Sequence, residues 1–111
     1  MTDAASGEAL EAFERLAGRF VSEAGVSRGT GFGSSPGLRV HGKIFAMLAG
    51  DALVVKLPRD RVDQLVASGA GARFDPGHGR VMKEWVTLPV TRADDWERLA
   101  AEAFAFVASR S

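Results

Sequence analysis

The sequence predicts one α+β domain, with an antiparallel five-stranded sheet and helices in the order α-β-β-β-β-α-β-α. Apolar residues recur at helical spacing near both ends of the chain, and short apolar runs separated by turns fill the middle. Those turns are too short for parallel crossovers, which need about a dozen residues or more, so neighbouring strands should be antiparallel. The 111 residues are enough for one core, so residues 1–111 are expected to form a single domain.

Three helices are predicted from apolar residues spaced three or four apart. The first should run from a cap at Ser6 to a stop at Gly25, and the second from Pro58 to Gly69. The third opens near Thr91. The residues expected to face inward in the first helix are Leu10, Phe13, Leu16, Ala17, Phe20, Val21 and Ala24. In the second they are Val62, Leu65 and Val66, and in the third Trp96, Leu99, Ala100, Ala103, Phe106 and Val107.

Five strands are expected where short apolar runs lie between turn residues. They are placed near Ser27–Phe32, Leu38–His41, Lys43–Leu48, Leu53–Leu57 and residues 81–89. The turns between them include His41-Gly42 and Ala49-Gly50-Asp51. Residues 70–80 contain an Asp-Pro-Gly turn and several glycines, and they are expected to form a loop.

The segment "KIFAMLAGDALVVKL" predicts strands that are apolar on both faces. Alternation places Ile44, Ala46 and Leu48 on one face and Phe45 and Met47 on the other. If the helices cover one face, the other is an exposed apolar patch, which is typical of a partner surface. A symmetric homodimer is the commonest way to cover such a patch. The expected interface residues are Phe45, Met47 and Val54. The alternative is a helix wrapped over the second face.

The residues give no sign of catalysis, a metal or a cofactor. The glycine-rich stretch "RGTGFGSSPG" leads into a strand and lacks the Lys-Ser/Thr of a P-loop, so it indicates a turn-rich sheet edge. There is no cysteine, and the two histidines, His41 and His78, have no ligand spacing around them. We therefore expect a protein that is not an enzyme and that holds neither a metal nor a cofactor.

Cellular location is predicted from the N-terminus and from the absence of cysteine. The first residues are acidic where a signal peptide would be basic and then apolar. No apolar run approaches the roughly 20 residues of a membrane span. A cysteine-free chain fits a reducing compartment. These features predict a cytoplasmic protein that does not enter a membrane.

The charge is zero overall but unevenly distributed. Residues 26–83 hold nine Lys and Arg against four Asp, whereas acids outnumber bases on either side. The candidate binding residues of a basic face are Arg39, Lys43, Lys56, His78, Arg80, Lys83 and Trp85. The alternative is an ordinary solvated surface, because acids are interleaved with these bases. Net charge does not point to nucleic acid, whose general binding depends on positive potential.

Residues Phe32 to Pro89 resemble the N-terminal domain of TfoX and its relatives in the MmcQ-YjbR group. The similarity lies in a Phe-Gly turn, a Gly-Lys-x-Phe-Ala hairpin, an apolar-Lys strand and a Gly-x-x-Met-x-x-Trp strand. The matching residues are Phe32, Gly33, Gly37, Gly42, Phe45, Ala46, Lys56, Gly79, Met82 and Trp85. The resemblance implies a fold of the secretion-chaperone type that is often dimeric and has no agreed catalytic residues. DNA binding is attached to the YjbR name.

Three functions follow as hypotheses. The first is a non-enzymatic module, homodimeric through its sheet, that binds a protein or acts as a regulatory domain. The alternative is a protein that binds nucleic acid through the basic hairpin face. A second alternative is a small-ligand site near His78, Lys83 and Trp85.

Overall fold

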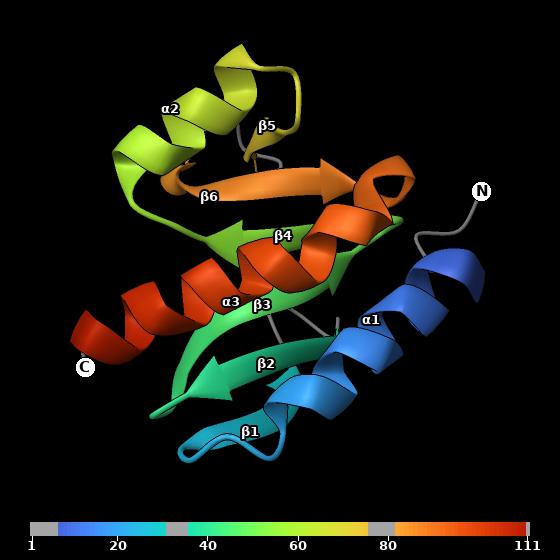
Figure 1. Cartoon of the computed structure of the whole chain (residues 1–111), viewed down its shortest axis with the longest axis vertical. Helices are drawn as coiled ribbons and strands as arrows, with labels where there is room; N and C mark the ends of the chain where they lie inside the picture. Colours follow the sequence, from blue (N-terminus) through green and yellow to red (C-terminus); the bar gives the residue numbers. More distant parts are fainter. Residues whose placement is uncertain (1–6, 31–35, 76–81, 111) are drawn as a thin grey trace.

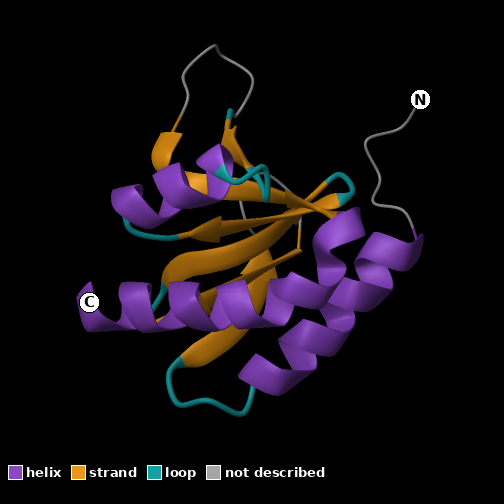
Figure 2. Ribbon diagram, turned by 45° about the horizontal axis from the view of Figure 1, so that its top comes forward, coloured by secondary structure: helices purple, strands orange, loops and turns teal. Residues whose placement is uncertain are grey.

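In the computed structural model, which describes residues 7–30, 36–75 and 82–110, three helices lie on one face of a six-stranded antiparallel sheet (Figures 1 and 2). The helices are α1 (Gly7–Phe20), α2 (Arg59–Ala67) and α3 (Ala93–Arg110), the last preceded by a 3-10 turn, η1 (Val90–Arg92). The strands are β1 (Val26–Thr30), β2 (Pro36–Val40), β3 (Lys43–Ala49), β4 (Ala52–Lys56), β5 (Ala72–Phe74) and β6 (Met82–Pro89). They lie in the order β1-β2-β3-β4-β6-β5. The predicted α+β class is confirmed.

The sheet has one strand more than the sequence pattern predicts, because β5 forms within the segment expected to be a loop. β5 has only three residues, and Ala72 and Arg73 are exposed, so it carries no apolar alternation. Before it, Gly71 lies so close to β6 that a Cβ would be 2.7 Å from the carbonyl oxygen of Thr87. A glycine therefore allows this edge strand to approach the sheet.

Helix α1 packs on the sheet with most of its predicted inward face, since Phe13, Leu16, Ala17 and Phe20 are buried. Its small residues Ala9 and Ala12 are also buried. Leu10 and Val21, which were predicted to face inward, are 42% and 44% exposed, and Val21 lies just after the end of the helix. Small side chains allow the helix backbone to approach its neighbours closely, and this selects the face that is buried. The helix ends at Phe20, before Ala24, which is exposed. The predicted cap at Ser6 lies outside the described residues.

Helix α3 crosses the strands at the centre of the sheet, and its predicted inward face is largely confirmed. Trp96, Leu99, Ala100, Ala103 and Val107 are buried, and Phe106 is half-buried. The indole Nε1 of Trp96 donates a hydrogen bond to the carbonyl oxygen of Pro89 at 3.2 Å, which joins the helix start to the end of β6. In α2, Val62 and Leu65 are buried and Val66 packs against the same core.

A β-bulge in β3 overturns the predicted facing of Phe45. Leu38 pairs with Ala46 and Arg39 pairs with Ile44, so Phe45 is an extra residue on β3. Phe45 and Ala46 are both buried beneath the helices, while Ile44 packs with Met47 on the other face. The Phe45 ring packs edge-on against Phe20 and Phe104, at 5.6 Å between ring centres in each case. Simple alternation across β3 was therefore the wrong assumption.

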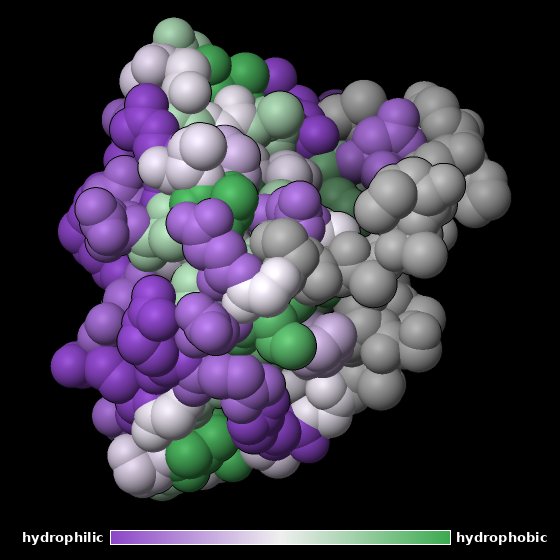
Figure 3. Space-filling view, turned by 90° about the vertical axis from the view of Figure 1, so that its right-hand side faces the viewer, coloured by the Kyte–Doolittle hydropathy of each residue, from purple (hydrophilic) through white to green (hydrophobic). Residues whose placement is uncertain are grey.

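The expected exposed apolar patch on the second face is also contradicted. Met47, Val54 and Trp85 form a small cluster there, at 1%, 0% and 6% exposure in the single chain. Among the described residues, the large apolar side chains that are exposed are Leu10 and Val21. Figure 3 shows, on the end of the molecule that faces the viewer, mainly hydrophilic surface with small separate hydrophobic areas, most of them to the left of the grey residues. None of the described helices covers the second face, so the alternative of a wrapped helix is not seen there either.

An ion pair joins α1 to the edge strand β1. The Arg28 guanidinium donates two hydrogen bonds to the Glu14 carboxylate, at 2.9 Å and 2.7 Å. These hydrogen bonds lower the pKa of Glu14 below its ordinary value, and they raise the pKa of Arg28. A carboxyl with a lowered pKa stabilises the fold above its unfolded-state pKa, and the contribution is lost as the pH falls through the folded-state pKa.

We expect Arg28→Gln to return the pKa of Glu14 toward its ordinary value. The free energy of unfolding should fall by about 0.2–1 kcal/mol at neutral pH, because both partners are partly exposed. The difference should disappear in acid. An NMR titration of the Glu14 carboxyl and urea unfolding at both pH values measure these effects. An unchanged Glu14 pKa in the variant would contradict the contact.

No helix in the described part of the chain is both long enough and apolar enough to cross a membrane.

Candidate anion-binding site

Basic side chains from four elements meet in a pocket at one end of the sheet. β2 and β4 end there, β3 and β6 begin there, and the C-terminal turn of α3 lies beside them, on the left in Figure 1. The pocket has a volume of about 410 Å³. Its lining residues are Arg39, Lys43, Ile44, Lys56, Trp85, Val107 and Arg110. We call it the sheet-end pocket.

The β2–β3 hairpin supplies the first two cations. Its two turn residues, His41 and Gly42, have φ angles of 53° and 82°, as tight two-residue hairpins require. Arg39 Nη1 donates a hydrogen bond to the carbonyl oxygen of Gly42 at 3.2 Å, which orients the guanidinium along the turn. The turn predicted at His41-Gly42 is confirmed, and it brings Arg39 and Lys43 to the rim of the same pocket.

The opposite wall is built by β4, β6 and α3. Lys56 pairs in register with Trp85, and its ammonium lies 5.4 Å from the centre of the indole ring, within range of a cation–π interaction. Trp85 is only 6% exposed, so its indole forms an apolar wall and offers little surface for base stacking. Arg110 comes from the last turn of α3.

Positive charge outweighs negative charge around the sheet-end pocket. Two of its four cations share the carboxylate of Glu84, which lies 3.9 Å from Lys56 Nζ and 3.3 Å from Arg110 Nη1. Lys43 is exposed at the first position of β3. Cationic side chains converging on a concave site can bind an anion by charge-assisted hydrogen bonds.

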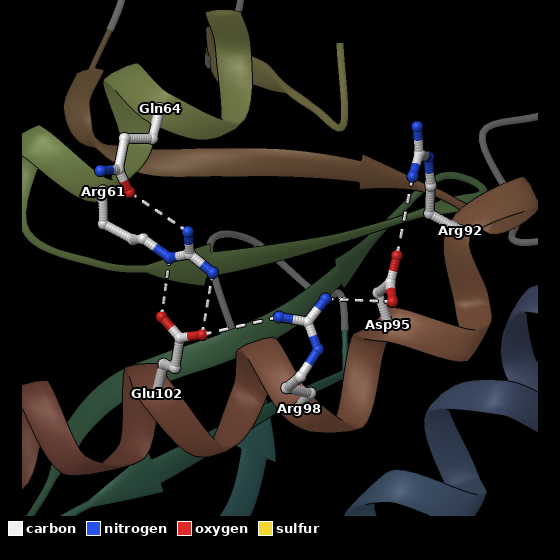
Figure 4. A network of polar contacts seen from close by, with 6 residues as sticks. All are labelled: Arg61, Gln64, Arg92, Asp95, Arg98 and Glu102. Carbon is white, nitrogen blue, oxygen red and sulfur yellow. Dashed lines mark hydrogen bonds and ion pairs between the residues drawn. The ribbon is translucent and has the colours of Figure 1, made fainter. Parts of the chain in front are cut away.

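Several arginines elsewhere in the described chain lie beside carboxylates. Arg61 donates two hydrogen bonds to Glu102, at 2.9 Å and 3.0 Å, and Arg92 and Arg98 both lie beside Asp95 (Figure 4). The Glu102 contact raises the pKa of Arg61. Such surface pairs contribute little energy, but they neutralise the charge of each arginine. The charge balance of the sheet-end pocket therefore differs from that of the helix face.

Two further pockets lie between helices, and neither has an excess of cations. The larger, about 510 Å³, lies between α1 and α3, where Arg19 pairs with Glu97 and Asp94 and Glu23 add negative charge. The other, about 460 Å³, lies between α2 and α3 beside the Arg61–Glu102 pair. Volume alone would favour the first, but its two arginines face three acids. We therefore place the candidate site at the sheet-end pocket.

Four of the residues predicted for a basic face line this pocket: Arg39, Lys43, Lys56 and Trp85. Lys83 is exposed on β6 and does not line it. His78 and Arg80 lie outside the described residues. No group of three His, Cys, Asp or Glu side chains in the described ranges could hold a metal ion.

Sequence reasoning missed Arg110, Val107 and Ile44. Arg110 lies in the last turn of a helix, where a basic residue is common and is explained by the helix dipole. Only the packing of α3 along β3 and β4 brings this turn to the sheet end. Ile44 was missed because the bulge in β3 changes the face of the sheet on which this residue lies.

The fold and the site together define an α+β domain whose helices cover one face of an antiparallel sheet and whose strand ends form a cationic pocket. The family model of YjbR matches residues 22–105, and the chain therefore belongs to the YjbR family. Comparison with curated proteins and with solved structures gives no match.

Proposed function

We propose that this protein is a non-enzymatic binding domain that holds nucleic acid by its phosphates in the sheet-end pocket. The observation that carries the proposal is the convergence of Arg39, Lys43, Lys56 and Arg110 on one concave site. Lys and Arg are the side chains that bind nucleic-acid phosphates, and neutralising phosphates releases counterions. This is the second of the functions that the sequence suggested.

The geometry favours contact with the backbone over reading of bases. Trp85 is largely buried, so the aromatic platforms that bind unstacked bases are not formed by it. The chain has no net charge, so attraction is confined to the pocket and its surroundings. We therefore expect weak binding that varies little with sequence and depends strongly on salt.

We propose binding without a reaction because of the kinds of side chain that line the pocket. Its lining residues are cations and apolar groups, and the neighbouring Glu84 is bound to two of the cations. No described lining residue is a hydroxyl or thiol nucleophile beside a general base, the arrangement that covalent catalysis requires.

Binding of a fluorescein-labelled DNA duplex of about 20 base pairs, followed by fluorescence anisotropy over a range of salt, tests the proposal. We expect a Kd of about 10⁻⁴ to 10⁻⁶ M near physiological salt. The logarithm of the association constant should fall with the logarithm of salt with a slope of about 2 to 4, since each neutralised phosphate contributes about 0.9. No binding at low salt would remove the proposal.

The homodimeric protein-interaction module stays a prediction. The residues expected at its interface were chosen because they should be exposed, and they are buried in the single chain. Met47 and Val54 are buried within one chain, and Phe45 lies beneath the helices. Light scattering at tens of micromolar protein checks the oligomeric state directly. The small-ligand alternative is weakened because Lys83 does not line the pocket.

A further inference from the structure

The carboxylate of Glu84 lies beside the sheet-end pocket and contacts two of the cations that line it. Its Oε2 lies 3.3 Å from Arg110 Nη1, and its Oε1 lies 3.9 Å from Lys56 Nζ. These two cations come from α3 and β4, on different walls of the sheet-end pocket. Glu84 therefore connects the walls through one side chain.

The backbone holds Glu84 at this position. Its carbonyl oxygen accepts a hydrogen bond from the Leu57 amide at 2.9 Å, which joins the start of β6 to the end of β4. The side chain is not enclosed, because it is 37% exposed and both of its partners are partly exposed as well. Ion pairs of this kind are individually weak, so a ligand of higher charge can displace the carboxylate.

We infer that Glu84 is an internal competitor for the anion site, and that it sets the affinity of the sheet-end pocket for phosphates. This inference rests on the proposed function of the pocket. A bound phosphate contacts Lys56 and Arg110 in place of Glu84. The free energy gained by the phosphate contacts is therefore reduced by the loss of the two Glu84 ion pairs. Glu84 also repels the ligand when its carboxylate remains nearby.

A purely structural role predicts the opposite result. If Glu84 mainly positioned Lys56 and Arg110, its removal would leave two long side chains to be ordered by the ligand, and affinity would fall. The sign of the change in affinity therefore separates a competitor from a positioning residue.

The test is Glu84→Gln, which keeps the size and hydrogen-bonding shape of the side chain and removes its charge. We expect the same labelled DNA duplex to bind about threefold to tenfold more tightly than to the wild-type protein, a range that corresponds to the weak energies of exposed ion pairs. Measurement near physiological ionic strength, where the Debye length is about 8 Å, limits the effect of net charge alone.

Asp95→Asn is the matched control. Asp95 also lies between two arginines, with Arg98 Nη2 at 3.1 Å and Arg92 Nη1 at 3.8 Å (Figure 4). It lies in the first turn of α3, whereas the pocket lies at the last turn of this helix. The control changes the net charge equally, so its affinity should stay within about twofold of wild type.

The outcomes separate the two proposals. Tighter binding by Glu84→Gln alone supports the competitor, even if the wild-type protein binds too weakly to measure. Unchanged or weaker binding by Glu84→Gln, with clear wild-type binding, overturns the competitor and leaves the proposed function standing. An equal gain in both variants overturns it too, because net charge would then explain the gain. No binding by any of the three proteins overturns both.

Discussion

Replacing Phe45 by alanine is expected to lower the free energy of unfolding by about 3–5 kcal/mol. The ring is fully buried, and it packs edge-on against Phe20 and Phe104 beneath the helices. Its removal leaves a cavity in the core and also breaks two aromatic contacts, each worth about 0.5–1.5 kcal/mol beyond the area they bury. Because small domains are stable by only about 5–15 kcal/mol, the variant should be close to its limit of stability.

Chemical unfolding followed by circular dichroism measures this effect, with Phe45→Leu as the control. Leucine keeps a large apolar side chain in the core, so it should lose clearly less stability than alanine. A double-mutant cycle with Phe20→Leu reports the aromatic contact itself. A loss below about 1 kcal/mol in Phe45→Ala would place the residue on a surface and contradict the bulge in β3.

Reversing two charges in the sheet-end pocket, Lys43→Glu with Lys56→Glu, is expected to weaken DNA binding by about 30-fold or more. Two of the four cations are lost, and two carboxylates are added to the lining of the pocket. Loss of about 1 kcal/mol for each phosphate contact, with added repulsion, corresponds to this change in affinity. The salt slope should fall by about 2, because two fewer phosphates are neutralised.

A second double variant, Arg15→Glu with Arg92→Glu, controls for net charge. Both arginines are exposed and neither lines the pocket, so the change in charge is the same but lies elsewhere. Anisotropy titrations of both variants at matched salt, with thermal melts to confirm folding, complete the comparison. Equal loss in the two variants would mean that binding follows overall charge and has no site.

The sequence predicts the architecture well because apolar periodicity and turn residues mark the helices and most of the strands. It failed where a local irregularity changes that period. At Phe45 one extra residue in β3 reverses the facing of everything before it, and no residue type in "KIFAMLA" marks the bulge. β5 was missed for a related reason, since three partly exposed residues at a sheet edge have no pattern.

The candidate site was predicted in part. Arg39, Lys43 and Lys56 lie at strand ends that the hairpin order brings together, so their proximity follows from an antiparallel meander. Arg110 could not be found in this way, because its place depends on the direction in which α3 crosses the sheet. The role of Glu84 was hidden as well, since in sequence it is one of several acids interleaved with the bases.

The most direct test of the central claim, that anions bind at the sheet end, uses the two tryptophans of the chain. Trp85 lines the sheet-end pocket, whereas Trp96 is buried at the far end of β6, beside Pro89. In ¹H–¹⁵N NMR spectra recorded while DNA is added, we expect the indole signal of Trp85 and the amides of Arg39 to Lys43 to shift progressively. The indole signal of Trp96 should stay in place. A shift of Trp96 without Trp85, or shifts centred on the groove between α1 and α3, would contradict the account.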